Sequence, residues 1–153
     1  MDFQLIINNF LVILQGLDET LILIFLSLIL GFFISIPFAL ARVSSIKVLS
    51  QSVYYYIFVI RGTPLLVQIY LIYFGLGSIK AVRESFLWIL LKEPFWCGVI
   101  ALVINTVAYT TEIFRGGIQS VTKGQIESCK SLGMNKFTMY FKIILPNAFR
   151  QAL

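Results

Sequence analysis

The chain has 153 residues, of which 59% are hydrophobic and 12% charged, and its mean hydropathy is +0.92. A soluble domain of this size could not bury so much apolar surface, so the composition excludes one and predicts a protein embedded in lipid. The formal net charge is +5, but the basic residues are spread between the apolar runs, which favours a role in membrane orientation and argues against nucleic acid as a partner.

Two apolar segments begin the chain. Residues 3–17 are moderately apolar with helical spacing, which predicts either an interfacial helix or a frayed extension of the first span. Residues 20–41 contain no charge, and a helix of this length measures about 33 Å, enough to cross a hydrocarbon core of about 30 Å. We therefore predict the first membrane span at about residues 20–41.

Small residues and flanking charges give this span a packing face and an orientation. Gly31, Ser35 and Ala39 recur every four residues, a stripe that lets another helix approach closely. Arg42 and Lys47 follow the span, and basic residues are enriched on the cytoplasmic side of membranes. The N-terminus is therefore expected outside.

The second span, predicted at about residues 54–76, contains an interruption that reads Arg61-Gly62-Thr63-Pro64. Pro64 lacks a backbone donor and Gly62 loosens the preceding turn, so a break or kink is expected here. Arg61 serves either as a snorkelling anchor beside that kink or as part of a gate or polar pathway. Gln68 lies one turn beyond Pro64, at membrane depth, and should face protein or water.

A polar stripe marks the third span, which is predicted at about residues 95–114 after an outer loop. Asn105, Tyr109 and Glu112 are spaced i, i+4 and i+7, so they share one helix face. Polar groups inside an apolar helix must face the bundle or a water-filled path, so the stripe serves either helix packing or a pathway. Arg115 follows Glu112 by three residues, and a structural ion pair between them is the preferred interpretation of Glu112.

Residues 115–136 form a basic, polar connection, with Gly116 and Gly117 loosening its start. It is predicted to lie in the cytoplasm, in agreement with the charges after the first span. Ser120 or Thr122 can cap a short helix here, which Gly133 can end in a left-handed conformation. Such a helix is marginal alone and should be ordered by the flanking spans or by a docked partner.

A fourth span is predicted to start at about residue 137. The last 17 residues are interrupted by Pro146 and by polar side chains, which makes a poor final span. We therefore expect about three and a half spans, in a membrane domain that is incomplete at its C-terminal end.

A spaced motif runs through residues 124–146. The segment resembles the EAA signature of permease subunits of ATP-binding cassette (ABC) importers: Glu-Ala-Ala, three residues, Gly, nine residues, Ile, one residue, Leu-Pro. Two small side chains, serine and cysteine, replace the two alanines. The resemblance assigns coupling to the ATPase to Gly124, Glu127, Ser128, Cys129, Gly133, Ile143, Leu145 and Pro146.

Segments upstream narrow the resemblance to the permeases that take up polar amino acids. They read Arg61-Gly62-Thr63-Pro64-Leu65-Leu66-Val67-Gln68, then Asn105 with Ala108-Tyr109 and Glu112, then Arg115-Gly116-Gly117-Ile118 and Lys123-Gly124-Gln125. The resemblance covers about residue 16 to the last residue. The ordered set at these separations is far more specific than any one piece.

The resemblance implies an all-α integral membrane protein with the type I ABC importer permease fold, whose core has five helices. It implies a second permease subunit, identical or homologous, which completes a central path. It also implies a cytoplasmic dimer of ATPase subunits that uses ATP and Mg, and an extracytoplasmic binding protein that delivers the amino acid. The ATPase groove would receive a coupling helix within residues 115–136, in the inner membrane of a bacterial cell.

No cofactor or metal is expected on this chain, and several functions stay open for its polar residues. The candidates for lining the path or packing the helices are Arg61, Gln68, Asn105, Tyr109 and Glu112. The alternative function is an incomplete, non-transporting scaffold or assembly subunit. An integral membrane enzyme is disfavoured, because histidine is absent and no paired carboxylates are expected at membrane depth. Cys97 and Cys129 are expected at opposite faces of the membrane, too far apart to form a disulfide.

Overall fold

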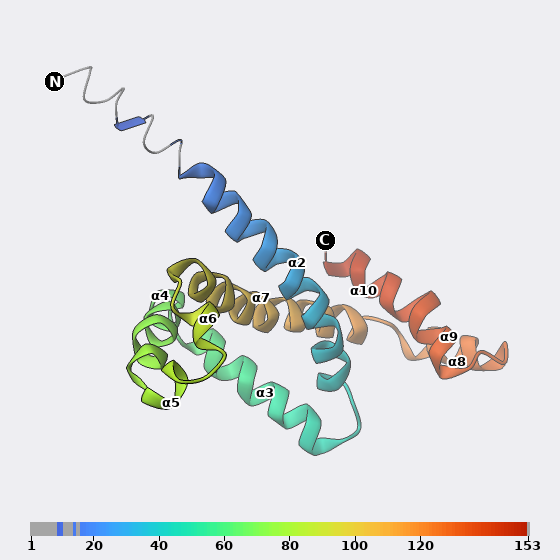
Figure 1. The fold of residues 1–153 in the computed structure, drawn as a ribbon. Helices are drawn as coiled ribbons and strands as arrows, with labels where there is room; N and C mark the ends of the chain where they lie inside the picture. Colours follow the sequence, from blue (N-terminus) through green and yellow to red (C-terminus); the bar gives the residue numbers. More distant parts are fainter. Residues whose placement is uncertain (1–8, 11–13, 15, 153) are drawn as a thin grey trace. The chain divides into compact units, whose positions relative to one another are not determined.

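The computed structural model describes residues 9, 10, 14 and 16–152, and every regular element in this part of the chain is helical. The segment 3–17, for which an interfacial helix was one prediction, lies largely outside the described residues. Figure 1 shows the helices in chain order. They are α2 (Leu17–Arg42), α3 (Lys47–Gly62), α4 (Leu65–Tyr70), η1 (Leu71–Leu76), α5 (Lys80–Arg83), α6 (Trp88–Leu91), α7 (Pro94–Gln119), α8 (Lys123–Ser131), α9 (Lys136–Met139), η2 (Tyr140–Ile144) and α10 (Leu145–Ala152).

The chain divides into two compact units. One contains Met1–Gly31 and Pro64–Ile104, and the other contains Phe32–Thr63 and Asn105–Leu153. Each of the long helices α2 and α7 is divided between the two units, α2 after Gly31 and α7 after Ile104. We describe the units separately below as the first and the second unit.

Helix α2 combines an apolar surface with one buried stripe. Asp18 and Glu19 lie in its first turn and Arg42 in its last, an arrangement that complements the helix dipole. The predicted small residues are buried, and Ser27 extends their stripe by one turn. The hydroxyls of Ser27 and Ser35 donate to carbonyls of the same helix, so their burial leaves no unmet donor. Most large apolar side chains of α2 are exposed, as expected of a surface that lipid covers.

The predicted interruption of the second apolar segment is confirmed as a complete break. Helix α3 ends at Gly62, and both Thr63 and Pro64 have extended backbone (φ −114°, ψ 138° and φ −61°, ψ 137°). The Thr63 hydroxyl donates to the Val59 carbonyl at 3.0 Å, which satisfies one terminal acceptor of α3. Helix α3 begins at Lys47, before the predicted start of the span, because polar residues continue the helix ahead of the apolar run.

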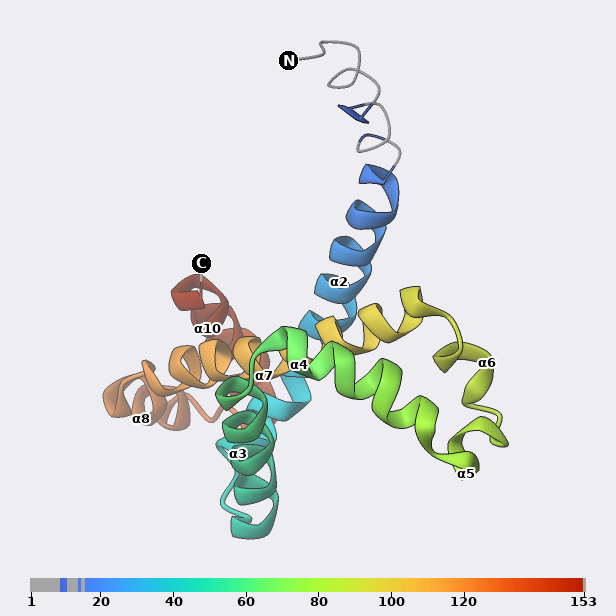
Figure 2. The ribbon, with the colours of Figure 1, turned by 90° about the vertical axis from the view of Figure 1, so that its left-hand side faces the viewer.

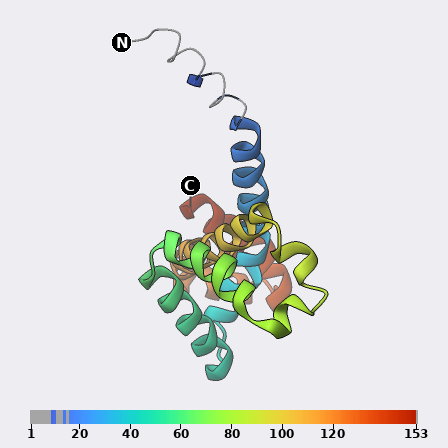
Figure 3. The same cartoon turned by 60° about the vertical axis from the view of Figure 1, so that its left-hand side comes forward.

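In the first unit, the chain turns back between η1 and α7. Trp88 in α6 packs beside Gly77, where an added Cβ would lie 3.6 Å from the indole. Figures 2 and 3 show η1 leading into α5 and α6 and the chain then entering α7. The Cys97 thiol is buried at the start of α7 and donates to the Leu91 carbonyl. This hydrogen bond joins the start of α7 to the end of α6.

In the second unit, parts of three helices pack together. Val53 and Ile57 of α3 and Ala108 of α7 form a buried cluster, against which Phe38 and Ala41 of α2 pack. The rings of α2 and α3 also meet, with the Phe38 and Tyr56 centroids 5.4 Å apart. This packing brings together the ends of helices that are far apart in the sequence.

Helix α7 continues past residue 114, where the third membrane span is predicted to end. It continues through Gly116 and Gly117 to Gln119. Glycine inside a helix costs only about 1 kcal/mol relative to alanine, which the hydrogen bonds of one added turn offset. Those include a bond of 2.6 Å from Arg115 Nη1 to Gln119 Oε1.

The helical path that begins at Lys136 also continues through Pro146, in the segment predicted to make a poor final span. The π-helical turn η2 immediately precedes α10, which starts one residue before the proline. A π turn widens the backbone, and this accommodates the ring and the missing N–H of proline. Asn135 starts the segment by accepting the Thr138 N–H at 2.8 Å.

Among the described residues, Leu17–Arg42 and Pro94–Gln119 are long and apolar enough to cross a membrane. Helix α3 with the Leu65–Leu76 segment gives a third crossing if this bent pair is one span. The number and bounds of the spans stay predictions.

Candidate functional site

The start of α8 lies within the predicted coupling segment and has a complete capping box. Thr122 is the N-cap residue, and its hydroxyl accepts the Gln125 N–H at 3.3 Å. The Gln125 side chain accepts the Thr122 N–H in return, at 3.0 Å. Two otherwise unsatisfied donors are thus bonded. Of the two predicted caps, Thr122 is confirmed, whereas the Ser120 hydroxyl donates to the Gly117 carbonyl.

The end of α8 is equally well defined. Gly133 has φ +70°, the predicted left-handed conformation. The Gly133 N–H donates to the Lys130 carbonyl at 2.9 Å, and the Met134 N–H donates to the Cys129 carbonyl at 3.1 Å. These two bonds form a Schellman motif, which satisfies the last carbonyls of the helix. An added Cβ at Gly133 would meet nothing within 4 Å, so glycine is required there for its backbone conformation and not for space.

The motif residues are divided between a packed and an exposed side. Cys129 joins Val121, Met139 and Ile144 in a buried cluster, and Ile143 packs against it. Glu127, Ser128 and Gly124 are exposed, as are Gly133 and Pro146. Two large apolar side chains also stand out of this segment, Leu132 at 77% exposure and Phe137 at 71%. The packed residues hold α8 against α9 and η2, and the exposed ones form an open surface on its other side.

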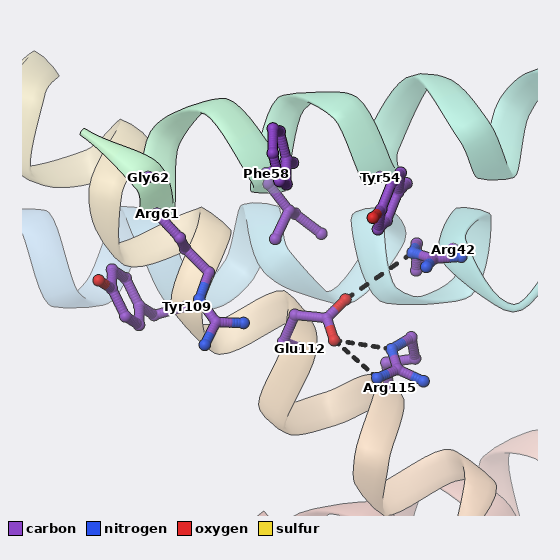
Figure 4. Close-up of a pocket in the computed structure, with 9 residues that line it drawn as sticks. Arg42, Tyr54, Phe58, Arg61, Gly62, Tyr109, Glu112 and Arg115 are labelled. Carbon is purple, nitrogen blue, oxygen red and sulfur yellow. Dashed lines mark hydrogen bonds and ion pairs between the residues drawn. The ribbon is translucent and has the colours of Figure 1, made fainter.

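A second polar feature is a cavity of about 460 Å³ in the second unit (Figure 4). It lies where the end of α2, the length of α3 and the second half of α7 meet. Its lining is dominated by charged and aromatic side chains: Arg42, Tyr54, Ile57, Phe58, Arg61, Gly62, Tyr109, Glu112 and Arg115. We refer to it as the arginine cavity.

Glu112 connects two helices within this cavity. Its Oε2 accepts from Arg115 at 2.7 Å (Nη2) and 2.8 Å (Nε), which confirms the predicted i, i+3 pair. Its Oε1 lies 3.7 Å from Arg42 Nε, so the same carboxylate also binds α2 to α7. The side chains are only 19–27% exposed, and screening by solvent is correspondingly weak. The Arg42 contact was not predicted, because 70 residues of chain separate the partners.

Arg42 is held from its other side by α3. Its guanidinium carbon lies 4.9 Å above the ring of Tyr54, and Nη1 donates to Ser50 Oγ at 3.1 Å. The Ser50 hydroxyl in turn donates to the Arg42 carbonyl at 2.7 Å. The end of α2 is therefore tied to both α3 and α7 by one side chain.

Arg61 lies in the same cavity, with its guanidinium carbon 5.0 Å from the centre of the Tyr109 ring. Figure 4 shows this guanidinium between Tyr109 and Glu112, within the cavity. A cation held over an aromatic face is attracted by the ring quadrupole. Of the two interpretations of Arg61, this position favours a place in a polar site over a simple membrane anchor.

The five predicted pathway or packing candidates thus separate into two groups. Arg61, Tyr109 and Glu112 line the arginine cavity together. Gln68, in the first unit, is 7% exposed, and Asn105 is partly buried on α7. Neither of these two lines the cavity, and both have interaction partners. Tyr54 and Arg42 are cavity residues that the sequence pattern did not identify.

Comparison with known proteins assigns the chain to a family. A family described as "Binding-protein-dependent transport system inner membrane component" matches residues 27–153. The chain is 48% identical to the nopaline transport system permease protein NocM of Agrobacterium fabrum, with 100% of this chain and 64% of that protein covered. It is 41% identical to the histidine/lysine/arginine/ornithine transport system permease protein HisM of Escherichia coli K12, covering 90% of this chain and 58% of that protein.

A solved structure supports the same assignment. The crystal structure of an amino acid ABC transporter with histidines matches with a TM-score of 0.81 and 39% identity, covering 99% of this chain and 67% of that one. This match confirms the predicted all-α fold of the importer permeases. The chain spans about three fifths of the length of the curated relatives it matches. It belongs to the family of binding-protein-dependent transport system inner membrane components.

Proposed function

We propose that this chain is a membrane-spanning permease subunit of an ATP-driven importer for polar amino acids. Its proposed place is the bacterial inner membrane, with the N-terminus outside, beside a second, identical or homologous permease subunit. The family membership supports the transport role. The names of relatives include nopaline, octopine, arginine and a histidine, lysine, arginine and ornithine system, so these compounds are the first substrates to test.

The observation that carries the proposal is the construction of α8. A nine-residue helix is marginal in isolation, yet both of its ends are closed by specific hydrogen bonds. Its buried side is anchored at Cys129, while Glu127 and Ser128 face outward beside the exposed Leu132. A short, rigid helix with an exposed polar and apolar surface suits docking into a groove of another protein. We propose a cytoplasmic ATPase subunit as that protein.

Energy would enter the permease through this contact. The ATPase dimer would bind ATP and Mg, and its closure would move α8 as a rigid body. Movement of α8 would be transmitted through its packed side to α9 and η2, because Met139 and Ile144 share one buried cluster with Cys129. The central path would then open alternately to either side, and an extracytoplasmic binding protein would deliver the amino acid.

The docking role can be tested by co-purification with the ATPase subunit of the same transport system. Glu127→Arg reverses a charge on the exposed side of α8 and should reduce recovery of the ATPase at least tenfold, with membrane insertion unchanged. Glu84→Arg makes the same change at the exposed C-terminal end of α5 and should have no effect. Gly133→Asp, which strains the helix end as well, should abolish recovery. Normal recovery of the ATPase with both α8 variants would refute the docking role.

Transport itself separates the proposal from a non-transporting scaffold. Proteoliposomes that contain the permease, the ATPase and the binding protein should accumulate a labelled amino acid only when ATP is supplied on the ATPase side. A complex that assembles with the ATPase but shows no ATP-dependent uptake of any compound named above would support the scaffold instead.

A further inference from the structure

We propose that the arginine cavity binds an oxyanion, a carboxylate or a phosphate, with Arg61 as its principal ligand. The first argument is charge. Three guanidinium groups line the cavity, on Arg42, Arg61 and Arg115, and Glu112 supplies the single carboxylate among the lining residues. The lining therefore has two positive charges in excess, concentrated in a partly enclosed space.

The second argument is how that one carboxylate is used. Arg115 contacts Glu112 through two nitrogens, and Arg42 approaches its other oxygen. Arg42 is further engaged by Ser50, and Arg115 by Gln119. Among the described residues, Arg61 has neither a carboxylate partner nor a hydrogen-bond acceptor, and its contact is the face of Tyr109. The donors of one guanidinium in this cavity are therefore available.

The third argument is preorganisation. Arginine has five N–H donors in a planar fork, which matches two oxygens of a carboxylate or a phosphate. Arg61 is exposed, and its guanidinium carbon lies 5.0 Å from the centre of the Tyr109 ring. This contact restricts the fork beside the cavity, so less side-chain freedom is lost when an anion binds. Ile57 and Phe58 of α3 form the apolar part of the cavity lining.

The volume limits the ligand to a small group. About 460 Å³ lies in the range of small-molecule sites and is far too small for a folded partner. A carboxylate on a small solute and the phosphate of a lipid headgroup present the same chemistry to Arg61. The two sources are distinguished experimentally.

The experiment measures anion-dependent stabilisation of the purified chain in dodecyl maltoside micelles, whose headgroup contains no phosphate. Thermal unfolding is followed with a thiol-reactive dye, because Cys97 and Cys129 are only 1% and 6% exposed and become reactive on unfolding. In the first arm, acetate or inorganic phosphate replaces chloride at constant ionic strength. In the second arm, the micelles contain phosphatidylglycerol or, as a matched control, diacylglycerol, with chloride as the only anion.

Three variants test the assignment. Arg61→Gln removes the fork and the charge, Arg61→Lys keeps the charge without the fork, and Arg83→Gln removes an exposed arginine from α5, outside the cavity. A hydrogen-bonded charge pair contributes about 1.5–3 kcal/mol, so Arg61→Gln should weaken the apparent anion affinity about 10- to 100-fold. The anion affinity of Arg61→Lys should lie between those of the unmodified chain and Arg61→Gln, and that of Arg83→Gln should equal the affinity of the unmodified chain. Without anion, Arg83→Gln should unfold at the temperature of the unmodified chain, and the anion response of each Arg61 variant is measured from its own unfolding temperature without anion.

Stabilisation that depends on Arg61 in the first arm identifies a solute carboxylate or free phosphate as the ligand. Dependence on Arg61 in the second arm alone identifies a lipid phosphate. The proposal is overturned if neither arm stabilises the chain, or if Arg61→Gln retains the full response. It is also overturned if Arg83→Gln loses as much of the anion-dependent stabilisation as Arg61→Gln, since the stabilisation would then depend only on net charge. None of these outcomes depends on whether α8 binds an ATPase.

Discussion

Helix α8 and the arginine cavity both lie in the second unit, and both are polar features of a largely apolar chain. They are held by different interactions. The ends of α8 are closed by hydrogen bonds between residues no more than five apart in the sequence. The cavity is closed by contacts between α2, α3 and α7, such as Arg42 with Glu112. Helix α8, whose ends are closed by local hydrogen bonds, can keep its shape while it moves. The arginine cavity changes shape whenever the three helices shift relative to one another.

The largest effect is expected from Glu112→Ala. Removing this carboxylate leaves Arg42 and Arg115 facing each other without compensation in a site that is mostly screened from water. We expect a loss of about 2 kcal/mol or more in the free energy of unfolding, measured by urea titration in micelles. Glu84→Ala is the control, because its pair with Lys80 is 67–82% exposed and should contribute less than about 0.5 kcal/mol. Equal effects of the two changes would show that the Glu112 contacts do not hold the helices together.

The next effect is expected from Gly133→Ala. A residue with a Cβ pays about 1–2 kcal/mol in the left-handed region, although space is available here. Amide hydrogen exchange should become faster in α8 and stay unchanged in α3. This result would show that the stability of α8 does not depend on the helices around the arginine cavity. Gly124→Ala is the matched control, because Gly124 is helical with open space around it and the change should stabilise α8. Slower exchange in Gly133→Ala would contradict the assigned role.

Thr122→Ala should have a smaller effect on the same helix. The change removes the acceptor for the Gln125 N–H and costs about 1 kcal/mol, typical of a lost N-cap. Thr122→Ser keeps the hydroxyl and should restore most of the protection of α8 against hydrogen exchange. If alanine and serine behave alike, the capping box does not stabilise the helix.

The smallest effect is expected at Tyr109. Replacement by leucine removes the ring beneath Arg61 and should cost about 0.5–1 kcal/mol, whereas phenylalanine keeps the ring and should cost less. Double-mutant cycles with Arg61→Gln measure the coupling between the two residues. A coupling energy of zero would mean that the stacked arrangement adds nothing to the cavity.

The successful predictions share a local physical cause. The cap at Thr122, the left-handed Gly133 and the break before Pro64 each follow from the conformational preferences of one or two residues. The i, i+3 pair of Glu112 with Arg115 follows from helix geometry in the same way. Such features need no knowledge of the neighbouring helices.

Where the helices end also depends on energies that neighbouring turns supply. Helix α7 continues past residue 114, where the third span is predicted to end, and α10 contains Pro146. In the structure, one added turn of hydrogen bonds offsets the cost of the glycines, and a π turn accommodates the proline. A local preference of about 1 kcal/mol is therefore a weak guide wherever a long helix can continue.

Hydropathy and local preferences predict the apolar spans of the chain, the break at Thr63-Pro64 and a short helix that Gly133 ends. Each of these rests on hydropathy or on hydrogen bonds between near neighbours in the chain. That Arg42, Arg61 and Arg115 share one cavity with Glu112 follows from the packing of the helices and not from any pattern along the chain. Three helices bring these groups together through the packing of apolar side chains, and no spacing in the sequence encodes which charges that packing places within reach of one another.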